Sequence, residues 1–112
     1  IPEEARVMHE EPFAPIAPIC GFSDTDDVIA RANALPFGLA GYVFSNDAAL
    51  AQTTAERLET GMVGINEMLI ATAEAPFGGV KDSGFGREGG AIGIMDYLEP
   101  KYIRHKLVSG VR

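Results

Sequence analysis

The sequence has 112 residues, 46% of them apolar, and a formal net charge of −7 at pH 7, so it is long enough for one small globular unit or part of one. An acidic chain lacks the basic surface that displaces counterions from nucleic acid or attracts anionic lipid, and we exclude both partners. A single cysteine permits no internal disulfide, and no apolar run reaches the about 20 residues needed to span a bilayer, so we expect a cytoplasmic protein.

The first predicted elements are an extended segment, a strand and a helix. Residues 1–12 are acidic and rich in proline, which favours extended backbone, and the opening Ile1–Pro2 without methionine suggests a truncated or trimmed chain. The apolar run 16–22 predicts a strand. Ser23 or Asp24 then supplies a helix N-cap, and apolar residues at helical spacing continue as far as Leu35.

Two more strands and a second helix are predicted over residues 39–66. Residues 39–44 and 62–66 read as buried strands, and the helix between them begins after 45–47 and ends near Glu59, with Gly61 as its stop. Strands that alternate with single amphipathic helices require crossovers and a parallel sheet. The expected fold is therefore α/β, a three-layer β-α-β-α-β unit with a parallel sheet.

The last third of the chain has a different character. Residues 67–90 are irregular and dense in glycine, and a compact domain keeps such a stretch mainly for function or for a subunit contact. A third helix is predicted over 91–98 and a final strand over 101–108. Its Lys101, Arg104 and Lys106 are typical of a charged sheet edge.

A dinucleotide-binding pattern, G-x-G-x-x-G, occurs at residues 84–89. It does not follow an apolar strand, and no acidic residue lies about 20 positions later to hold a ribose hydroxyl. We interpret this match as accidental, a glycine-rich turn before a helix.

Five segments together resemble the aldehyde dehydrogenase family in order and spacing: EEPFAP at 10–15, FGLAGYV at 37–43, GMVGIN at 61–66, APFGGVKDSGFGRE at 75–88 and YLEPKY at 97–102. The resemblance covers nearly the whole chain and implies a C-terminal segment of such an enzyme. It implies that residues 1–98 are the incomplete C-terminal part of the catalytic domain. Residues 99–112 would be an arm whose strand joins subunits into a homodimer or homotetramer.

The resemblance also implies a cofactor contact in the first motif. Glu11 would bond the ribose hydroxyls next to the nicotinamide of NAD or NADP, and Phe13 would pack beside the ring. A carboxylate suits two vicinal hydroxyl donors, and an apolar face suits the ring. Ala14 stands where the family usually has glycine. Without the resemblance, Glu11 would be read as a solvated surface acid.

A substrate contact is implied by the fourth motif and the loop before it. Phe77 matches a family phenylalanine that walls the aldehyde pocket, although a core aromatic before a turn is the alternative. The loop 67–74 is most similar to the succinate-semialdehyde dehydrogenase branch, where it reaches the far end of the substrate. Ala71 stands where that branch commonly has serine, and Thr72 is the neighbouring hydroxyl.

The family reaction implied by the resemblance needs a cysteine thiolate, a hydride transfer to NAD(P) and a glutamate that activates water against the thioester. Cys20 lacks the nucleophile motif and is read as a small buried hydrophobe, so no catalytic residue is assigned, and the isolated chain is expected to be inactive and not to bind the cofactor. Neither His9 nor His105 has the spacing of a base or a metal ligand. Lys81 and Arg87 are read as structural ion pairs or turn donors.

Other readings stay open at this point. The chain could be a non-catalytic, self-assembling interaction module, or a free-standing nucleotide-binding domain. Within the family, it could belong to an enzyme for a different semialdehyde.

Overall fold

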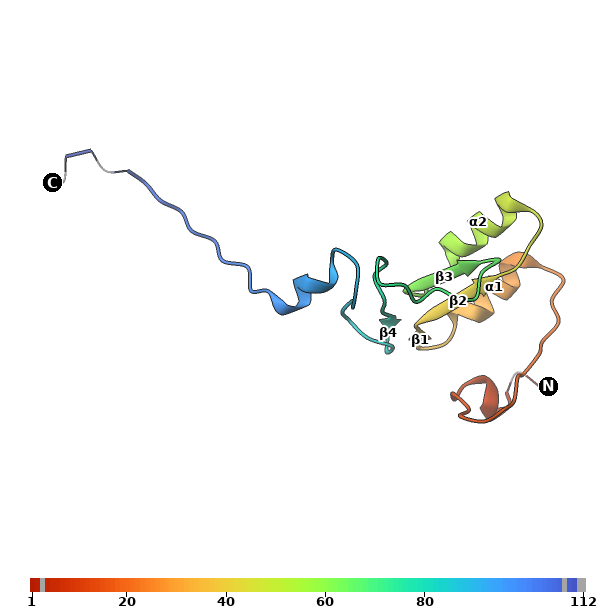
Figure 1. The fold of residues 1–112 in the computed structure, drawn as a ribbon. Coiled ribbons are helices and arrows are strands. Elements are labelled where there is room, and N and C mark those ends of the chain that lie inside the picture. The colour runs from red at the N-terminus through yellow and green to blue at the C-terminus, as the bar shows by residue number, and fades with distance from the viewer. Residues whose placement is uncertain (3, 108, 111–112) are drawn as a thin grey trace.

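A computed structural model describes residues 1–2, 4–107 and 109–110 of the chain. It measures 79 × 32 × 26 Å, with a radius of gyration of 21.0 Å, whereas a compact domain of about 100 residues has a radius near 13 Å. The difference comes from the ends of the chain. The C-terminal segment runs straight away from the body, and the N-terminal segment loops out on the other side (Figure 1).

The centre of the body is a parallel pair of strands with a helical crossover. Strand β2 (Ala40–Val43) pairs with β3 (Met62–Ile65), and helix α2 (Ala48–Arg57) connects them and packs against both. Asp47 caps α2 by accepting a hydrogen bond from the Leu50 amide at 3.0 Å. The prediction of a strand, a helix and a strand over 39–66 is confirmed.

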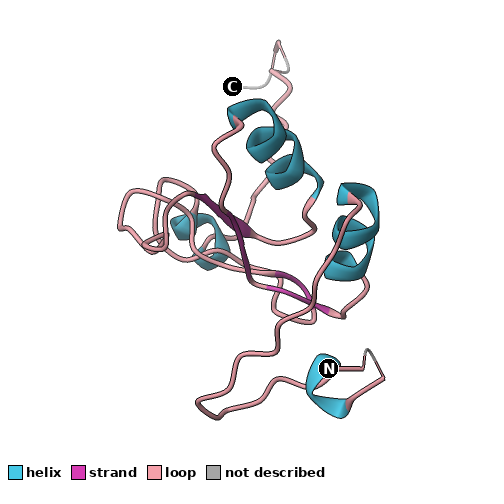
Figure 2. Ribbon diagram, turned by 90° about the vertical axis from the view of Figure 1, so that its right-hand side faces the viewer, coloured by secondary structure: helices cyan, strands magenta, loops and turns pink. Residues whose placement is uncertain are grey.

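Helix α1 (Thr25–Asn33) precedes this unit and has the N-cap expected from the sequence. The Asp24 carboxylate accepts a hydrogen bond from the Asp27 amide at 2.7 Å, and Asp26 and Asp27 stand in the positively polarised first turn. Ile29 is the buried residue of its apolar face. The two helices and the strands appear together in Figure 2, with the N-terminal segment separate from them.

A second, antiparallel pair lies beside the first sheet. Strand β1 (Phe37–Gly38) pairs with β4 (Val80–Lys81), which belongs to the glycine-rich stretch. The Gly61 amide donates to the Gly38 carbonyl at 2.9 Å. A Cβ atom at Gly61 would overlap the Gly78 carbonyl, so the glycine-rich stretch packs backbone to backbone on the body.

The predicted strand at residues 16–22 is wrong. These residues form no strand, so the parallel sheet of the described chain has two strands, not three, and the three-layer arrangement is not complete within it. Pro18 removes an amide donor from the middle of the run, and Ile19 is exposed. Cys20 is half-buried and lies in this irregular segment rather than in a strand. Nearby, η1 (Arg6–Met8) is a short 3-10 helix in a segment expected to be extended.

The C-terminal elements also differ from expectation. The α-helix predicted over 91–98 is wrong: residues 91–92 form a turn, and a 3-10 helix, η2 (Gly93–Tyr97), follows. Gly89 and Gly90, just before this turn, have left-handed backbone. Residues 101–107 are extended but pair with no strand of the described chain. Val108, the end of the predicted strand, and Val111 and Arg112 of the predicted arm lie outside the described residues.

The chain buries little apolar surface. Ile29, Ala51 and Met62 form the buried apolar core, and the accessible surface is 9250 Å², against roughly 6,000 Å² for a compact monomer of this mass. Many large apolar side chains, Phe13, Phe85 and Leu107 among them, contribute to this exposed surface. Within the described residues, no helix is long and apolar enough to cross a membrane.

Candidate functional site

A cavity of about 510 Å³ separates the N-terminal segment from the body. Glu11 lines one side, and Leu39, Tyr42 and Ser83 are among the residues that line the other. No described residue donates a hydrogen bond to the Glu11 carboxylate, whereas the adjacent Glu10 forms an ion pair with Arg6 at 2.7 Å. Glu11 therefore presents a carboxylate whose acceptor capacity is unused within the described chain.

Phe13, the second predicted cofactor residue, is almost fully open. Its side chain is 93% exposed and does not line the cavity that Glu11 lines. The backbone around it turns tightly, with the Ala14 amide donating to the Pro12 carbonyl at 3.0 Å and the Ile16 amide donating to the Ala14 carbonyl at 2.8 Å. The local backbone therefore presents the ring as a free apolar face.

A second cavity, of about 380 Å³, adjoins the first because Leu39 and Ser83 line both. Phe77 lines the second cavity and is 37% exposed. Its backbone is fixed by a reciprocal bridge with Glu88, in which each amide donates to the other residue's carbonyl at 2.7 Å. Glu11 and Phe77 thus lie on two adjoining cavities.

The loop 67–74 carries the other predicted substrate residues. Ala71 and Thr72 are exposed, and neither lines the two cavities. The end of the loop is tied to the glycine-rich stretch by the Gly90 amide, which donates to the Ala73 carbonyl at 3.0 Å. The structure therefore places Phe77 on a cavity wall but leaves Ala71 and Thr72 on an open edge.

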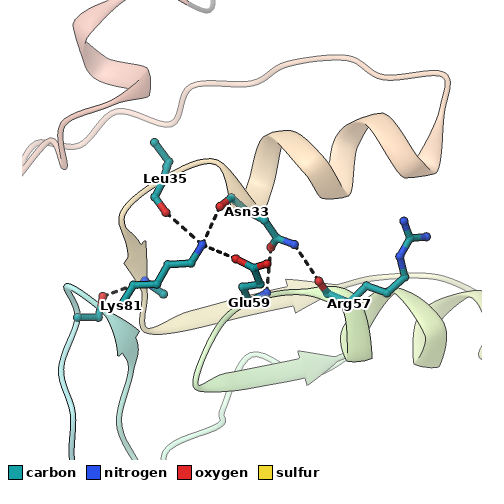
Figure 3. A network of polar contacts seen from close by, with 7 residues as sticks. Asn33, Leu35, Arg57, Glu59 and Lys81 are labelled. Carbon is teal, nitrogen blue, oxygen red and sulfur yellow. Dashed lines mark hydrogen bonds and ion pairs between the residues drawn. The ribbon is translucent and has the colours of Figure 1, made fainter.

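Lys81 and Arg87 donate to backbone carbonyls, as expected, but the ionic partner of Lys81 was not predicted. Lys81 forms an ion pair with Glu59 at 2.7 Å rather than with Asp82 (Figure 3). Arg87 donates to the Gly79 and Gly86 carbonyls at 2.7 and 2.8 Å. In the sequence, Lys81 is noticeable only because it lies near glycines in a long motif. That position does not predict an ion pair with Glu59, which lies 22 residues earlier in the chain.

The remaining candidates show no reactive arrangement within the described residues. Cys20 lines neither cavity, and the described part of the chain holds no cluster of histidine, cysteine and carboxylate side chains that could bind a metal ion. The glycine pattern at 84–89 lies in an irregular segment, with a β-bridge at Glu88, before the short 3-10 helix η2. A five-residue 3-10 helix does not provide the α-helix N-terminus that binds a pyrophosphate.

Comparison with known proteins decides the family. The sequence model of the aldehyde dehydrogenase family matches residues 1–103. The chain belongs to the aldehyde dehydrogenase family. Human mitochondrial succinate-semialdehyde dehydrogenase is 52% identical over 103 residues, and the match covers 92% of this chain and 19% of that protein.

Other members of the aldehyde dehydrogenase family are similarly close. The 3-sulfolactaldehyde dehydrogenase of Pseudomonas putida is 53% identical over 89% of this chain and 21% of its own length. The glutarate-semialdehyde dehydrogenase of Pseudomonas aeruginosa is 52% identical over 92% of this chain and 21% of its own length. The chain thus spans about a fifth of these relatives. A non-catalytic module is not favoured by relatives that are named dehydrogenases.

Solved aldehyde dehydrogenase structures share the fold. A crystal structure described as an NADP-dependent enzyme from E. coli has a TM-score of 0.88 and 50% identity, over 92% of this chain and 21% of the other. An NAD⁺ complex of aldehyde dehydrogenase from Bacillus cereus has a TM-score of 0.85 and 36% identity, over 88% and 20%. The backbone of this chain therefore matches a part of intact aldehyde dehydrogenases.

Proposed function

We propose that this chain is the C-terminal part of an NAD(P)-dependent aldehyde dehydrogenase that oxidises an acid semialdehyde, with succinate semialdehyde as the first candidate. Residues 1–98 would complete the catalytic domain, and 99–112 would form the subunit arm. The proposal is supported by relatives named for succinate semialdehyde, glutarate semialdehyde and sulfolactaldehyde. A cytoplasmic location stays a prediction, since the human relative is named as mitochondrial.

The observation that carries the proposal is the adjoining pair of cavities. Glu11 lines one and Phe77 lines the other, and Leu39 and Ser83 line both. An oxidation by hydride transfer needs the cofactor and the aldehyde to meet at reacting distance. Two cavities that share a wall, one with a free carboxylate and one with an aromatic side, suit that requirement.

The residues present fit a dinucleotide at the first cavity. The Glu11 carboxylate has no donor among the described residues, and it can accept hydrogen bonds from two vicinal ribose hydroxyls. Phe13 does not line this cavity, but it follows the lining residue Pro12 in the chain, and its exposed ring offers an apolar face for the nicotinamide. When bound, the nicotinamide takes up the two electrons removed from the aldehyde. This chain's part is to hold and orient its ribose.

The aldehyde would meet Phe77 and the loop 67–74. In each relative's name, the substrate carries an acid group besides the aldehyde. A buried acid group needs cations or hydroxyls around it. The loop offers the Thr72 hydroxyl but also contains Glu67 and Glu74 and no basic residue. The positive charge that holds the acid group must therefore come from outside this loop.

The nucleophile and the general base are assigned to the part of the enzyme that this chain does not contain. Cys20 lines neither cavity and lies in an irregular segment, half-buried. On this proposal, Cys20 is not the thiol that attacks the aldehyde. On this proposal the isolated 112 residues neither oxidise aldehydes nor bind the cofactor detectably by calorimetry.

The arm would serve assembly. Residues 101–107 are extended, and Tyr102, Ile103 and Leu107 are exposed. An extended segment whose backbone groups pair with nothing in the described chain is ready to add to the edge of another sheet. A homodimer or homotetramer formed through this strand is the proposed assembly.

The test uses the full-length enzyme. It should reduce NAD or NADP with succinate or glutarate semialdehyde faster than with butanal, which lacks the acid group. Glu11→Ala should lower the single-turnover rate by roughly 10- to 100-fold, because the nicotinamide loses its orientation. Glu10→Ala is the matched control, since Glu10 is engaged by Arg6, and it should change the rate less than about twofold. Unchanged single-turnover rates in Glu11→Ala would sink the cofactor assignment.

A further inference from the structure

The Lys81 ammonium group joins three parts of the fold. It lies 3.2 Å or less from three oxygen atoms: the Asn33 carbonyl at 2.7 Å, the Leu35 carbonyl at 3.2 Å and the Glu59 carboxylate at 2.7 Å (Figure 3). The two carbonyls stand at the C-terminal end of α1, where backbone acceptors lack helical partners and a cation is favourable. Lys81 thus caps α1 from strand β4.

The Asn33 side chain completes this cluster from the other side. Its amide nitrogen donates to the Arg57 carbonyl at 2.8 Å, and its carbonyl oxygen accepts from the Glu59 amide at 2.9 Å. The end of α1 is therefore bonded to the segment that leaves α2. We call Asn33, Glu59 and Lys81 the lysine clamp. It ties α1, the α2–β3 connection and β4 at one point.

The backbone at Lys81 shows that its place is enforced. Lys81 has a φ of 55°, in the left-handed region of the backbone that residues other than glycine and asparagine rarely adopt. The next amide, of Asp82, donates to the Pro36 carbonyl at 2.9 Å, and Lys81 itself pairs with Phe37. A lysine held in an unfavourable backbone conformation by three polar contacts is over-determined by its surroundings.

The segment between Lys81 and Phe77 has no room to absorb a shift. A Cβ atom at Gly78 would lie 2.5 Å from the Gly86 carbonyl oxygen, and one at Gly79 would lie 2.5 Å from the Ser83 Cβ atom. Arg87 holds the Gly79 carbonyl at 2.7 Å. Because Gly78 and Gly79 are closely packed and join β4 to Phe77 directly, a displacement of β4 would press on Phe77, against the bridge that Phe77 forms with Glu88.

We propose that Lys81 is a positioning residue for the aldehyde pocket: the lysine clamp fixes β4 and, through Gly78 and Gly79, sets the place of Phe77. This inference rests on the proposed role of Phe77 in the pocket. A lysine with only a structural role would affect how much enzyme folds. A positioning lysine also changes the affinity of the folded enzyme for the aldehyde.

The experiment uses the full-length enzyme with the Lys81→Met substitution, which keeps an unbranched side chain of similar length but removes the charge and the donors. We expect the KM for the aldehyde to rise about fivefold or more per active site, while the KM for NAD(P) and the single-turnover rate at saturating aldehyde change less than about twofold. Arg57→Met is the matched control, because that side chain pairs with Asp26 at 2.6 Å outside the clamp. It should leave all three quantities unchanged.

A second variant keeps the test decisive if Lys81→Met does not fold. Glu59→Gln removes the ionic partner but leaves both carbonyl contacts, and it should raise the aldehyde KM about twofold. If both variants fold, the double variant should show no larger rise than Lys81→Met alone, because the two residues act through one contact. Additive effects, or a loss of folded enzyme with an unchanged aldehyde KM, would overturn the proposal.

Phe77→Ala separates this inference from the proposed function. An unchanged aldehyde KM in Phe77→Ala would contradict the pocket assignment itself. A raised KM in Phe77→Ala with an unchanged KM in Lys81→Met and in Glu59→Gln would leave the pocket intact and show that the clamp does not position it.

Discussion

The body of the molecule, residues 25–97, and its two terminal segments are held in different ways. In the body, hydrogen bonds join residues distant in sequence, such as Gly61 with Gly38 and Asn66 with Ser45. In the N-terminal segment the ion pair between Arg6 and Glu10 joins residues four apart, and at the C-terminal end Leu107 is 85% exposed. On the proposed function, both ends would pack against other parts of the enzyme. The candidate cofactor residues Glu11 and Phe13 lie in one of these ends.

This contrast matters for function because of where the candidate residues lie. Phe77 belongs to the body, where a packed glycine-rich stretch fixes its position. Glu11 lies on the N-terminal segment and lines the first cavity. If this segment is the more mobile of the two walls, the site would suit a cofactor that enters and leaves during turnover.

The largest loss of stability is expected from a substitution at the closest backbone contact of the body. Gly61→Ala would drive a Cβ atom into the Gly78 carbonyl and against the Gly79 Cα atom, and it should destabilise the full-length protein by about 3 kcal/mol. Gly21→Ala is the matched change in the N-terminal segment, where a Cβ atom would meet nothing within 4 Å. It should cost less than about 0.5 kcal/mol. If Gly61→Ala and Gly21→Ala lowered the midpoint of thermal unfolding by the same amount, the distinction between a closely packed body and loosely packed ends would be wrong.

A smaller effect is expected at Asn66, which closes the ends of β2 and β3. Its φ is 53°, and its side chain bonds the Ser45 amide and carbonyl, each at 2.9 Å. Asn66→Ala should cost about 2 kcal/mol because it loses both bonds and disfavours the left-handed backbone, and Asn66→Gly about 1 kcal/mol. The control is Asn46, an exposed asparagine in the connection between β2 and α2, next to Ser45. If Asn46→Ala shifts the unfolding midpoint as much as Asn66→Ala, the assigned bonds are not what stabilises this end of the sheet.

The smallest effect is expected in the N-terminal segment. Arg6 and Glu10 form a pair whose side chains are 85% and 60% exposed. Water and salt screen such a pair, so Arg6→Met should change the free energy of unfolding by less than about 0.5 kcal/mol. Denaturant unfolding of the full-length protein at low and high salt measures this. A larger loss that disappears at high salt would show that this segment is held electrostatically in the intact enzyme.

The sequence predicted the elements whose signals are local. The sequence offered Ser23 or Asp24 as the first N-cap and residues 45–47 as the second, and Asp24 and Asp47 are the residues that cap α1 and α2. The strand β3 and its parallel pairing with β2 also follow from apolar runs on either side of a helix. By contrast, residues 16–22 have the composition of a strand, but a strand needs a partner, and none pairs with them in the described chain.

The site could be predicted only through the family resemblance. No periodicity distinguishes Glu11 from its neighbour Glu10, and only the structure shows that Arg6 engages one of them and leaves the other free. The lysine clamp could not be predicted from the sequence, for a different reason. Lys81 contacts the Asn33 carbonyl 48 residues away in the chain, and both contacts at the end of α1 are to backbone atoms, which leave no pattern in the side chains.

The most direct test of the central claim is a crystal structure of the full-length enzyme with NAD or NADP bound. The predicted result is a Glu11 carboxylate oxygen within about 2.5–3.0 Å of a hydroxyl of the nicotinamide ribose, the range of a charge-assisted hydrogen bond. Phe77 should lie on the aldehyde side of the nicotinamide. A ribose bound by other residues, with the Glu11 carboxylate directed into solvent, would contradict the account.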